Sequence, residues 1–228
     1  MLRSQLRRDK NMVIAIDGPA AAGKGTLAGR LAEQFGLAHL DTGLLYRATA
    51  ARLLLDGGDP NSELTAAAVA RSLTIKDLTG LELLDEQVAA IASVVAVHDG
   101  VRTALLDFQR RFAASPPSGA RGAVLDGRDI GSVILPNADI KIFVTASSEV
   151  RAERRYLELR ARGVHSIKSL VLQEIQERDE RDRHREVAPM VPAKDAFLLD
   201  TTNMDADAAF EAAYEFVMLH QTSTGRSV

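Results

Sequence analysis

The sequence of 228 residues has no cysteine, no long hydrophobic run and no large excess of either charge, and each absence excludes a class of protein. A chain without cysteine forms no disulfide and no thiolate zinc site, which fits a reducing cytoplasm. No apolar run approaches the ~20 residues of a membrane-spanning helix. Residues 1–11 are basic and polar, without the apolar core of a secretory signal. We therefore expect a cytoplasmic protein with no membrane segment.

Charge and hydrophobic content narrow the class further. Lysine and arginine total 28 against 31 aspartate and glutamate, a net charge of -3, which argues against a general nucleic-acid binder. Hydrophobic residues make up 46% of the chain, enough to bury a substantial core. Arginine is concentrated locally, which indicates small anionic ligands. We expect a monomer with no obligate protein partner.

A glycine-rich segment follows the apolar run 13–16 and has the pattern of a phosphate-binding loop. Its glycines let successive backbone N–H groups turn toward one anion, the following helix adds the positive end of its dipole, and Lys24 supplies a mobile charge. Gly25 stands where serine or threonine is usual and the hydroxyl comes at Thr26, so direct coordination of Mg²⁺ by the loop stays open. The predicted phosphate-binding residues are Gly18, Ala21, Ala22, Gly23, Lys24, Gly25 and Thr26.

Five short apolar runs bounded by turn signals predict an α/β fold with a five-stranded parallel sheet flanked by helices. Three of them end in polar residues, at Asp17, at Asp41 and at Asp126, on the sheet edge where such folds bind ligands. The expected strands are Met12–Ile16, Leu37–Leu40, Ala123–Leu125, Ile140–Val144 and Phe197–Leu199.

The chain between the second and third expected strands is longer than one crossover helix requires. Clusters of turn residues at 56–61 and 115–119 bound it, so it predicts an inserted subdomain. We expect a flexible basic extension, a core in two parts and an insertion, at residues 1–11, 12–59 with 119–228, and 60–118.

An arginine-rich helix predicted at 167–185 has two interpretations. One is a solvated face of four-residue ion pairs, Glu174/Arg178, Glu177/Arg181 and Asp179/Arg183, worth about 0.2–0.5 kcal/mol each. The other is a row of guanidinium groups that clamps phosphates, because helical spacing gathers Arg178, Arg181, Asp182 and Arg185 on one side. Beside a phosphate loop we favour the second. The five histidines are scattered without ligand spacing, and we assign them no role.

The chain resembles the bacterial-type cytidylate kinases, which belong to the nucleoside monophosphate kinase group of P-loop proteins. Its GKGT ending is usual in that group. Residues 72–84 are shorter than the family pattern and lack its isoleucine-arginine-threonine segment. The stretches that carry the resemblance are IDGPAAAGKGTLA, LDTGLLYRA, DGRDIGSVILPNADIKIFVTAS, RAERR, ERDERDRHREVAPMVPAKDA and LLDTTNM.

The resemblance implies a P-loop core, a monophosphate-binding insertion and a helical lid at about 151–185. It implies transfer of a phosphoryl group from ATP to CMP or dCMP, with Mg²⁺, giving ADP and CDP or dCDP. Because arginines repel one another across an empty site, we expect the lid to stand open without nucleotide. Gly163 is the expected turn or hinge within it.

The resemblance also implies roles for single residues. Lys24, Asp126, Arg128 and Arg185 are the expected catalytic residues, and Arg154 and Arg155 the lid residues that hold ATP. Thr201 to Asn203 lies where the family borders the adenine. The expected residues for the acceptor nucleotide are Thr42, Arg47, Arg128 and Arg185 for its phosphate, Arg178 and Asp182 for its sugar, and Ser93, Arg102 and Asp129 for its base.

The chemistry of cytosine agrees with this assignment. A carboxylate such as Asp129 can accept from the cytosine amino group, and a guanidinium such as Arg102 can donate to the ring nitrogen. Uracil reverses both groups and would leave them unpaired, at ~1–3 kcal/mol each.

Two alternatives stay open: a kinase of another nucleoside monophosphate on the same fold, and a non-catalytic nucleotide-binding regulator. The regulator would need no arginines converging on an acceptor pocket. The direct ligands of a metal ion stay unassigned.

Overall fold

The computed structural model describes residues 11–224 and contains a five-stranded, all-parallel sheet in that range. The strand order is β2-β3-β1-β4-β5, so the strand that leads into the glycine-rich loop is central. Every expected strand is confirmed to within two residues. The strands are β1 (Met12–Asp17), β2 (Ala38–Asp41), β3 (Gly122–Gly127), β4 (Ile140–Thr145) and β5 (Phe197–Asp200).

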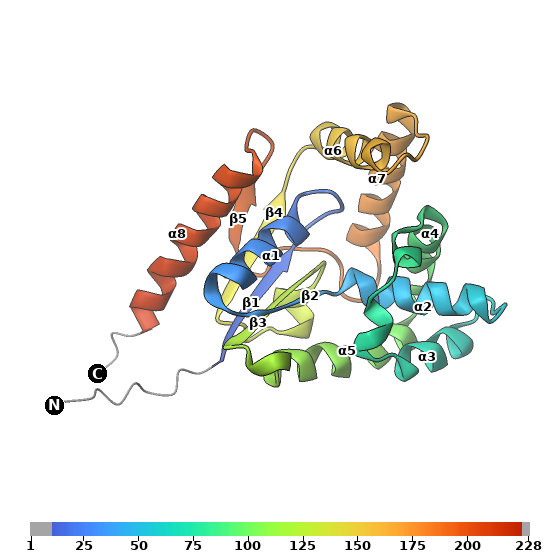
Figure 1. Ribbon diagram of the computed structural model, residues 1–228, viewed down its shortest axis with the longest axis horizontal. Helices are drawn as coiled ribbons and strands as arrows, with labels where there is room; N and C mark the ends of the chain where they lie inside the picture. The colour runs from blue at the N-terminus through green and yellow to red at the C-terminus, as the bar shows by residue number, and fades with distance from the viewer. Residues whose placement is uncertain (1–10, 225–228) are drawn as a thin grey trace.

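Helices cover both faces of the sheet (Figure 1). On one face α1 and α8 pack over β1, β4 and β5 through a buried cluster that includes Ile14, Leu31 and Val217. On the other face a larger cluster joins β3 to the helices between the second and third strands. The helices are α1 (Lys24–Phe35), α2 (Gly43–Leu55), α3 (Glu63–Ser72), α4 (Glu86–Val95), α5 (Asp99–Ala114), α6 (Ser148–Ala161), α7 (Lys168–His184) and α8 (Ala206–Thr224).

The predicted insertion folds as a helical layer on α2. Small buried residues of α3, among them Ala66 and Ala70, pack with Leu53 of α2 and Leu105 of α5 in one cluster. Where the sequence departs from the family pattern the chain forms two 3₁₀ turns, Ile75–Leu78 and Leu81–Leu84. The shorter segment thus crosses from α3 to α4 in two tight turns.

The pair α6 and α7 lies above the carboxyl ends of the strands in Figure 1. A small core including Leu159, Val171 and Ile175 joins the two helices. Gly163 follows α6 with a positive φ of 75°, and its N–H bonds to the carbonyl of Arg160. The predicted turn at Gly163 is therefore confirmed.

Two sequence predictions concern the chain ends and the membrane. The basic extension at 1–11 lies outside the described residues except for Asn11. Among residues 11–224 no single helix is long and apolar enough to cross a bilayer; α4 and α5 meet the length and composition only together, and they are bent by 102°.

Candidate functional site

The glycine-rich loop curls in front of β1 and leads into α1. Gly18 has a φ of 143°, and a Cβ there would lie 1.9 Å from the carbonyl oxygen of Val144, so only glycine fits. Ala21 and Gly23 have φ angles of 57° and 91°, which turn the backbone around the start of α1 at Lys24. The loop therefore has the curled backbone that an anion-binding concavity requires.

Lys24 is folded back into this loop. Its Nζ donates to the carbonyl of Pro19 at 2.8 Å, and the side chain is buried. Burial, followed by the nearby Arg128, lowers the pKa of Lys24 from 10.5 to about 7. Because an approaching anion favours the charged form, bound phosphate would raise this pKa again.

Asp17, the last residue of β1, positions the next loop. Its two carboxylate oxygens accept the backbone N–H groups of Ile130 and Gly131, each at 2.7 Å. Burial raises the pKa of Asp17 to about 6, although those hydrogen bonds oppose the rise. This aspartate thereby fixes the chain just after Arg128 and Asp129.

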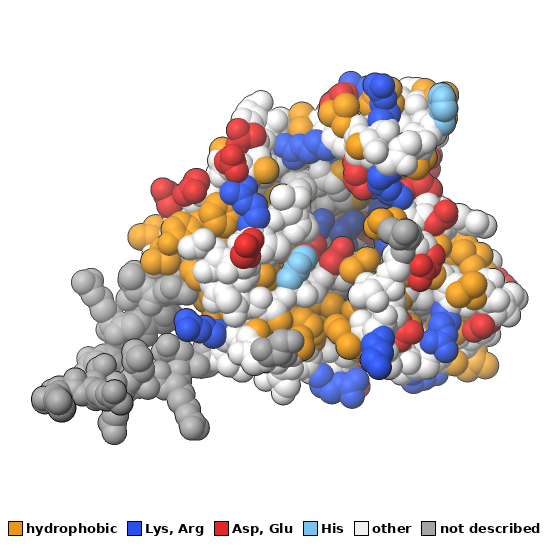
Figure 2. Space-filling view, viewed as in Figure 1, with side chains coloured by type: hydrophobic (Ala, Val, Ile, Leu, Met, Phe, Trp, Pro, Cys, Tyr) orange, Lys and Arg blue, Asp and Glu red, His pale blue; other side chains and the backbone are white. Residues whose placement is uncertain are grey.

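A cavity of about 540 Å³ opens between the carboxyl ends of the strands, α4, α5, and the α6–α7 pair. Figure 2 shows it as a hollow in which lysine and arginine side chains are visible. The cavity runs from the glycine-rich loop to α5. The predicted site residues that line it are Ala21, Gly23, Lys24, Gly25, Thr26, Thr42, Arg47, Ser93, Arg102, Asp126, Arg128, Asp129, Arg155, Arg178, Asp182 and Arg185.

At the α5 end of the cavity Asp129 holds two arginines. Arg102 Nη2 lies 2.5 Å from Asp129 Oδ2, and Arg185 Nη2 lies 3.3 Å from Oδ1. Tyr46 and Gln109 line the same end, and sequence reasoning missed both. Gln109 follows Arg102 at a seven-residue helical spacing, the signal that places it on the same side of α5.

A second ion pair lies nearer the loop, between Arg128 Nε and Asp182 Oδ2 at 2.7 Å. Burial alone would raise the pKa of Asp182, but Arg128 and Arg178 hold it below its usual value. Among the described residues the buried Nε of Arg178 has no hydrogen-bond partner. Burial and then Arg128 lower the pKa of Arg178 to about 10. The site therefore carries a cationic group that an anionic ligand would stabilise.

The arginine row on α7 differs from its prediction in two respects. Arg178, Asp182 and Arg185 face the cavity as expected, but Arg181 lines a different cleft. Asp179 does not pair with Arg183; its carboxylate binds Arg151 of α6 through two contacts of 3.0 and 2.6 Å. A buried bidentate pair between helices replaces the expected surface pair along one helix.

Two neighbouring strands end in carboxylates at the bottom of the cavity, where Asp41 and Asp126 are register partners of β2 and β3. The Thr42 hydroxyl donates to the carbonyl of Asp126 at 2.8 Å. His39 Nε2 lies 2.7 Å from Asp126 Oδ1, although the sequence had indicated no role for any histidine. Burial, and then the adjacent Asp126, raises the pKa of Asp41.

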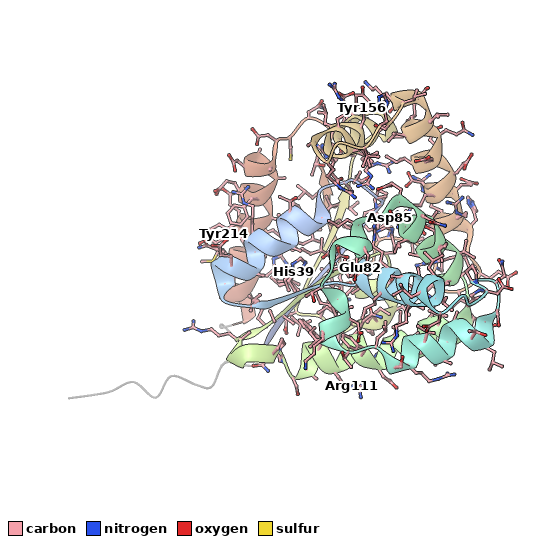
Figure 3. The ribbon with its side chains drawn as sticks, turned by 45° about the vertical axis from the view of Figure 1, so that its right-hand side comes forward. His39, Glu82, Asp85, Arg111, Tyr156 and Tyr214 are labelled. Carbon is pink, nitrogen blue, oxygen red and sulfur yellow. The ribbon has the colours of Figure 1, made fainter. Side chains whose placement is uncertain are left out.

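The α6 helix is joined to the insertion across the mouth of the cavity. Arg155 Nη2 lies 2.5 Å from Glu86 Oε1 at the start of α4, and Arg162 donates to the carbonyl of Leu84. Figure 3 labels Asp85, the N-cap residue of α4, below this helix pair. Opposite charges thus link α6 to the insertion in this structure. The expected opening of residues 151–185 without nucleotide stays a prediction.

A second cavity of about 340 Å³ adjoins the loop on the side of α8 and includes Ala22 and Arg154 in its lining. The Arg154 guanidinium donates to the hydroxyl and carbonyl of Thr201 and to the carbonyl of Met204. Gly18 lines neither cavity, since its place is against Val144.

Known proteins resemble the chain over most of its length. The family model for cytidylate kinase matches residues 14–218. A cytidylate kinase of Paramagnetospirillum magneticum is 58% identical over 201 residues, 88% of this chain and 95% of that protein. One of Nitrobacter winogradskyi is 52% identical over 216 residues, 95% of this chain and all of that protein.

A solved structure of an uncharacterized protein from Eubacterium ventriosum shares the fold alone, with a TM-score of 0.52 and 14% identity over 90% of this chain and 98% of that one. The family model and the two curated relatives, by contrast, match this chain in sequence over most of its length. The chain belongs to the cytidylate kinase family.

Proposed function

We propose that this chain transfers the γ-phosphoryl group of ATP to CMP or dCMP, giving ADP and CDP or dCDP, as a step of pyrimidine nucleotide metabolism in the cytoplasm. The observation that carries the proposal is one continuous cavity that joins the phosphate loop to the Arg102–Asp129 pair. Donor and acceptor groups thus have sites at opposite ends of the same space. The proposal includes activity as a monomer with no obligate protein partner.

Phosphoryl transfer needs alignment and charge neutralisation more than covalent chemistry. Lys24 and the loop backbone hold the β- and γ-phosphates of ATP. Arg47, Arg128 and Arg185 surround the acceptor phosphate and the group in transfer, with Thr42 beside them. Because the three arginines are held by the carbonyls of Leu83 and Ala188 and by the Asp182 carboxylate, little reorganisation is needed when the phosphates bind.

The acceptor base lies at the α5 end, between Ser93, Arg102 and Asp129. The Asp129 carboxylate has about four lone-pair directions and uses two for arginines, so it can accept a further bond from the cytosine amino group. The acceptor sugar lies beside Asp182 and Arg178. Uracil would place a carbonyl against the carboxylate instead, and the site would reject it.

The second cavity takes the adenine of ATP, because it shares Ala21, Gly23 and Thr26 with the first cavity and is lined on its other side by Thr201 and Met204. Arg154 braces the segment that holds these two residues, and Arg155 lies between the two cavities. Residues 60–118 act as the monophosphate-binding insertion and residues 151–185 as the lid.

The residues present fit Mg²⁺ bound mainly through phosphate and water. Within residues 11–224 no group of three or more His, Asp or Glu side chains could hold a metal ion alone. Thr26 and Asp126 offer a hydroxyl and a carboxylate oxygen in the cavity, and Mg²⁺ in nucleotide sites is held by one or two such groups plus phosphates. When bound, the ion neutralises charge on the β- and γ-phosphates.

A coupled assay of ADP release across CMP, dCMP, UMP, AMP and GMP tests the proposal. We expect turnover with CMP and dCMP and a kcat/KM at least about thirtyfold lower with UMP, since two mismatched buried groups cost ~1–3 kcal/mol each. Preference for another monophosphate would establish a different kinase on the same fold. ATP binding without turnover on any acceptor would favour a regulator.

A further inference from the structure

The strand end that carries Asp126 includes a histidine contact that the proposed reaction has not used. His39 lies on β2 and Asp126 at the end of β3, 87 residues later in the chain, and their Nε2 and Oδ1 atoms are 2.7 Å apart. The histidine side chain is 28% exposed, whereas that of Asp126 is 6% exposed. The ring thus reaches a buried carboxylate from the outside. In Figure 3, His39 is labelled at the front of the molecule, close to α1.

The Asp126 carboxylate is surrounded by charged groups of both signs. Asp41 is its register partner on β2, and Lys24 and Arg128 are the charged groups that act on both carboxylates from α1 and from beyond β3. Asp41 has its own donor, the N–H of Gly43 at 2.8 Å. The His39 ring is the contact that orients the Asp126 carboxylate, as the Gly43 N–H orients the carboxylate of Asp41. Two like charges are thereby kept in defined orientations instead of rotating toward or away from each other.

The backbone and the side chain of Asp126 are held separately. The Thr42 hydroxyl and the Thr42 N–H both bind the Asp126 carbonyl, at 2.8 and 3.0 Å. Both contacts are to the backbone carbonyl, whereas His39 contacts the carboxylate itself, at Oδ1. Since Oδ1 is taken by the histidine, Oδ2 is the oxygen left for the cavity. The orientation of that oxygen depends on one imidazole.

We propose that His39 is a positioning residue for phosphoryl transfer, whose Nε2–H holds the Asp126 carboxylate so that its second oxygen faces the phosphate end of the cavity. The inference rests on the proposed function, since the orientation of the Asp126 carboxylate affects the reaction only if phosphates and Mg²⁺ bind in the cavity. Groups that orient a carboxylate near a metal and phosphate are worth roughly 10–100-fold in activity or metal affinity. His39 acts through Asp126 and does not itself touch substrate.

The test compares His39→Leu, which removes the N–H, with His39→Gln, whose side-chain amide can restore a donor to Asp126. His220→Gln on α8, away from both cavities, is the matched control. Two measurements are made on each full-length variant: steady-state kinetics with CMP, and calorimetric binding of ADP with and without Mg²⁺. Circular dichroism and thermal unfolding report on the fold.

We expect His39→Leu to lower kcat roughly tenfold with little change in KM for CMP, and to weaken ADP binding only when Mg²⁺ is present. His39→Gln should regain most of the wild-type kcat and most of the Mg²⁺-dependent ADP binding. His220→Gln should match the wild type in both measurements. Wild-type kcat and Mg²⁺-dependent binding in His39→Leu would overturn the proposal. Equal impairment of the Leu and Gln variants with reduced thermal stability would overturn it in favour of a structural role. If the wild type phosphorylates no acceptor, the proposed function fails, and the calorimetry still decides whether His39 matters.

Discussion

Arg102 and Asp129 form an ion pair of 2.5 Å inside the cavity, with side chains only 8% and 7% exposed. Removing one partner from a buried pair leaves an uncompensated charge, so such pairs are strongly interdependent. Arg185 adds a second cation to the same carboxylate. The region proposed to read the base is therefore preassembled around Asp129.

Asp129→Asn should erode discrimination between CMP and UMP. The asparagine amide offers a donor that the uracil carbonyl can accept, and it removes the negative charge that repels that carbonyl. We expect the ratio of kcat/KM for CMP over UMP to fall at least about fivefold, as for one mismatched buried group at ~1–3 kcal/mol. Asp207→Asn, at an exposed position on α8, is the control. An unchanged ratio would mean that the base is read elsewhere.

Lys24→Met should abolish most turnover and stabilise the ligand-free chain. The pKa of Lys24 falls from 10.5 to about 7 on folding, so between these values the unfolded chain holds a proton that the folded chain releases. The stability cost of the lysine is therefore complete below about pH 7 and vanishes as the pH rises toward 10.5.

Thermal unfolding of Lys24→Met across this pH range checks the sign. The gain in Tm over the wild type should be larger at pH 6 than near pH 10. Lys194→Met, at an exposed position, should show no such dependence. A gain in Tm that grows with pH would contradict the conclusion that burial disfavours the charged form of Lys24.

Arg128→Ala should lower kcat by about a hundredfold or more with a smaller rise in KM for CMP, because it removes charge that acts on the group in transfer. It also frees Asp182, which Arg128 binds at 2.7 Å. Steady-state kinetics with Arg121→Ala as an exposed control separate the two parameters. An effect confined to KM would mean that Arg128 binds CMP in the ground state and does not stabilise the transition state specifically.

Glu86→Gln should loosen the contact between α6 and the insertion. The substitution removes the charge that Arg155 binds at 2.5 Å, in a partly exposed pair. Hydrogen exchange across 151–185 should rise in the ligand-free variant and fall again with a bisubstrate analogue. Glu215→Gln on α8 is the control. Equal protection of this segment with and without the analogue, in both proteins, would show that it is not a lid.

Local signals predicted most of this molecule. All five strands were identifiable because each is a short apolar run that ends in a turn, and the loop at 18–26 has a fixed spacing. The strand-end residues of the cavity, such as Asp126, could be placed because strand ends share one edge of a sheet. The cavity residues on helices, such as Ser93 and Arg102, were named through the family resemblance. These features depend on chain neighbours, which the sequence displays directly.

The missed features are contacts between distant segments. His39 and Asp126 meet only because β2 pairs with β3, and no periodicity links positions 87 residues apart. Four-residue spacing favoured Asp179 with Arg183, yet the packing of α7 on α6 buries Asp179 against Arg151 instead. Likewise the contact of Arg155 with Glu86 depends on where α4 begins, which follows from the two tight turns before it.

Transfer of labelled phosphate from γ-labelled ATP to CMP tests the central claim most directly. With the wild-type protein and Mg²⁺, the label should appear in the β-phosphate of CDP in step with ADP formation. Lys24→Met should produce almost none. Release of labelled inorganic phosphate without labelled CDP would show that water is the acceptor and would contradict this account.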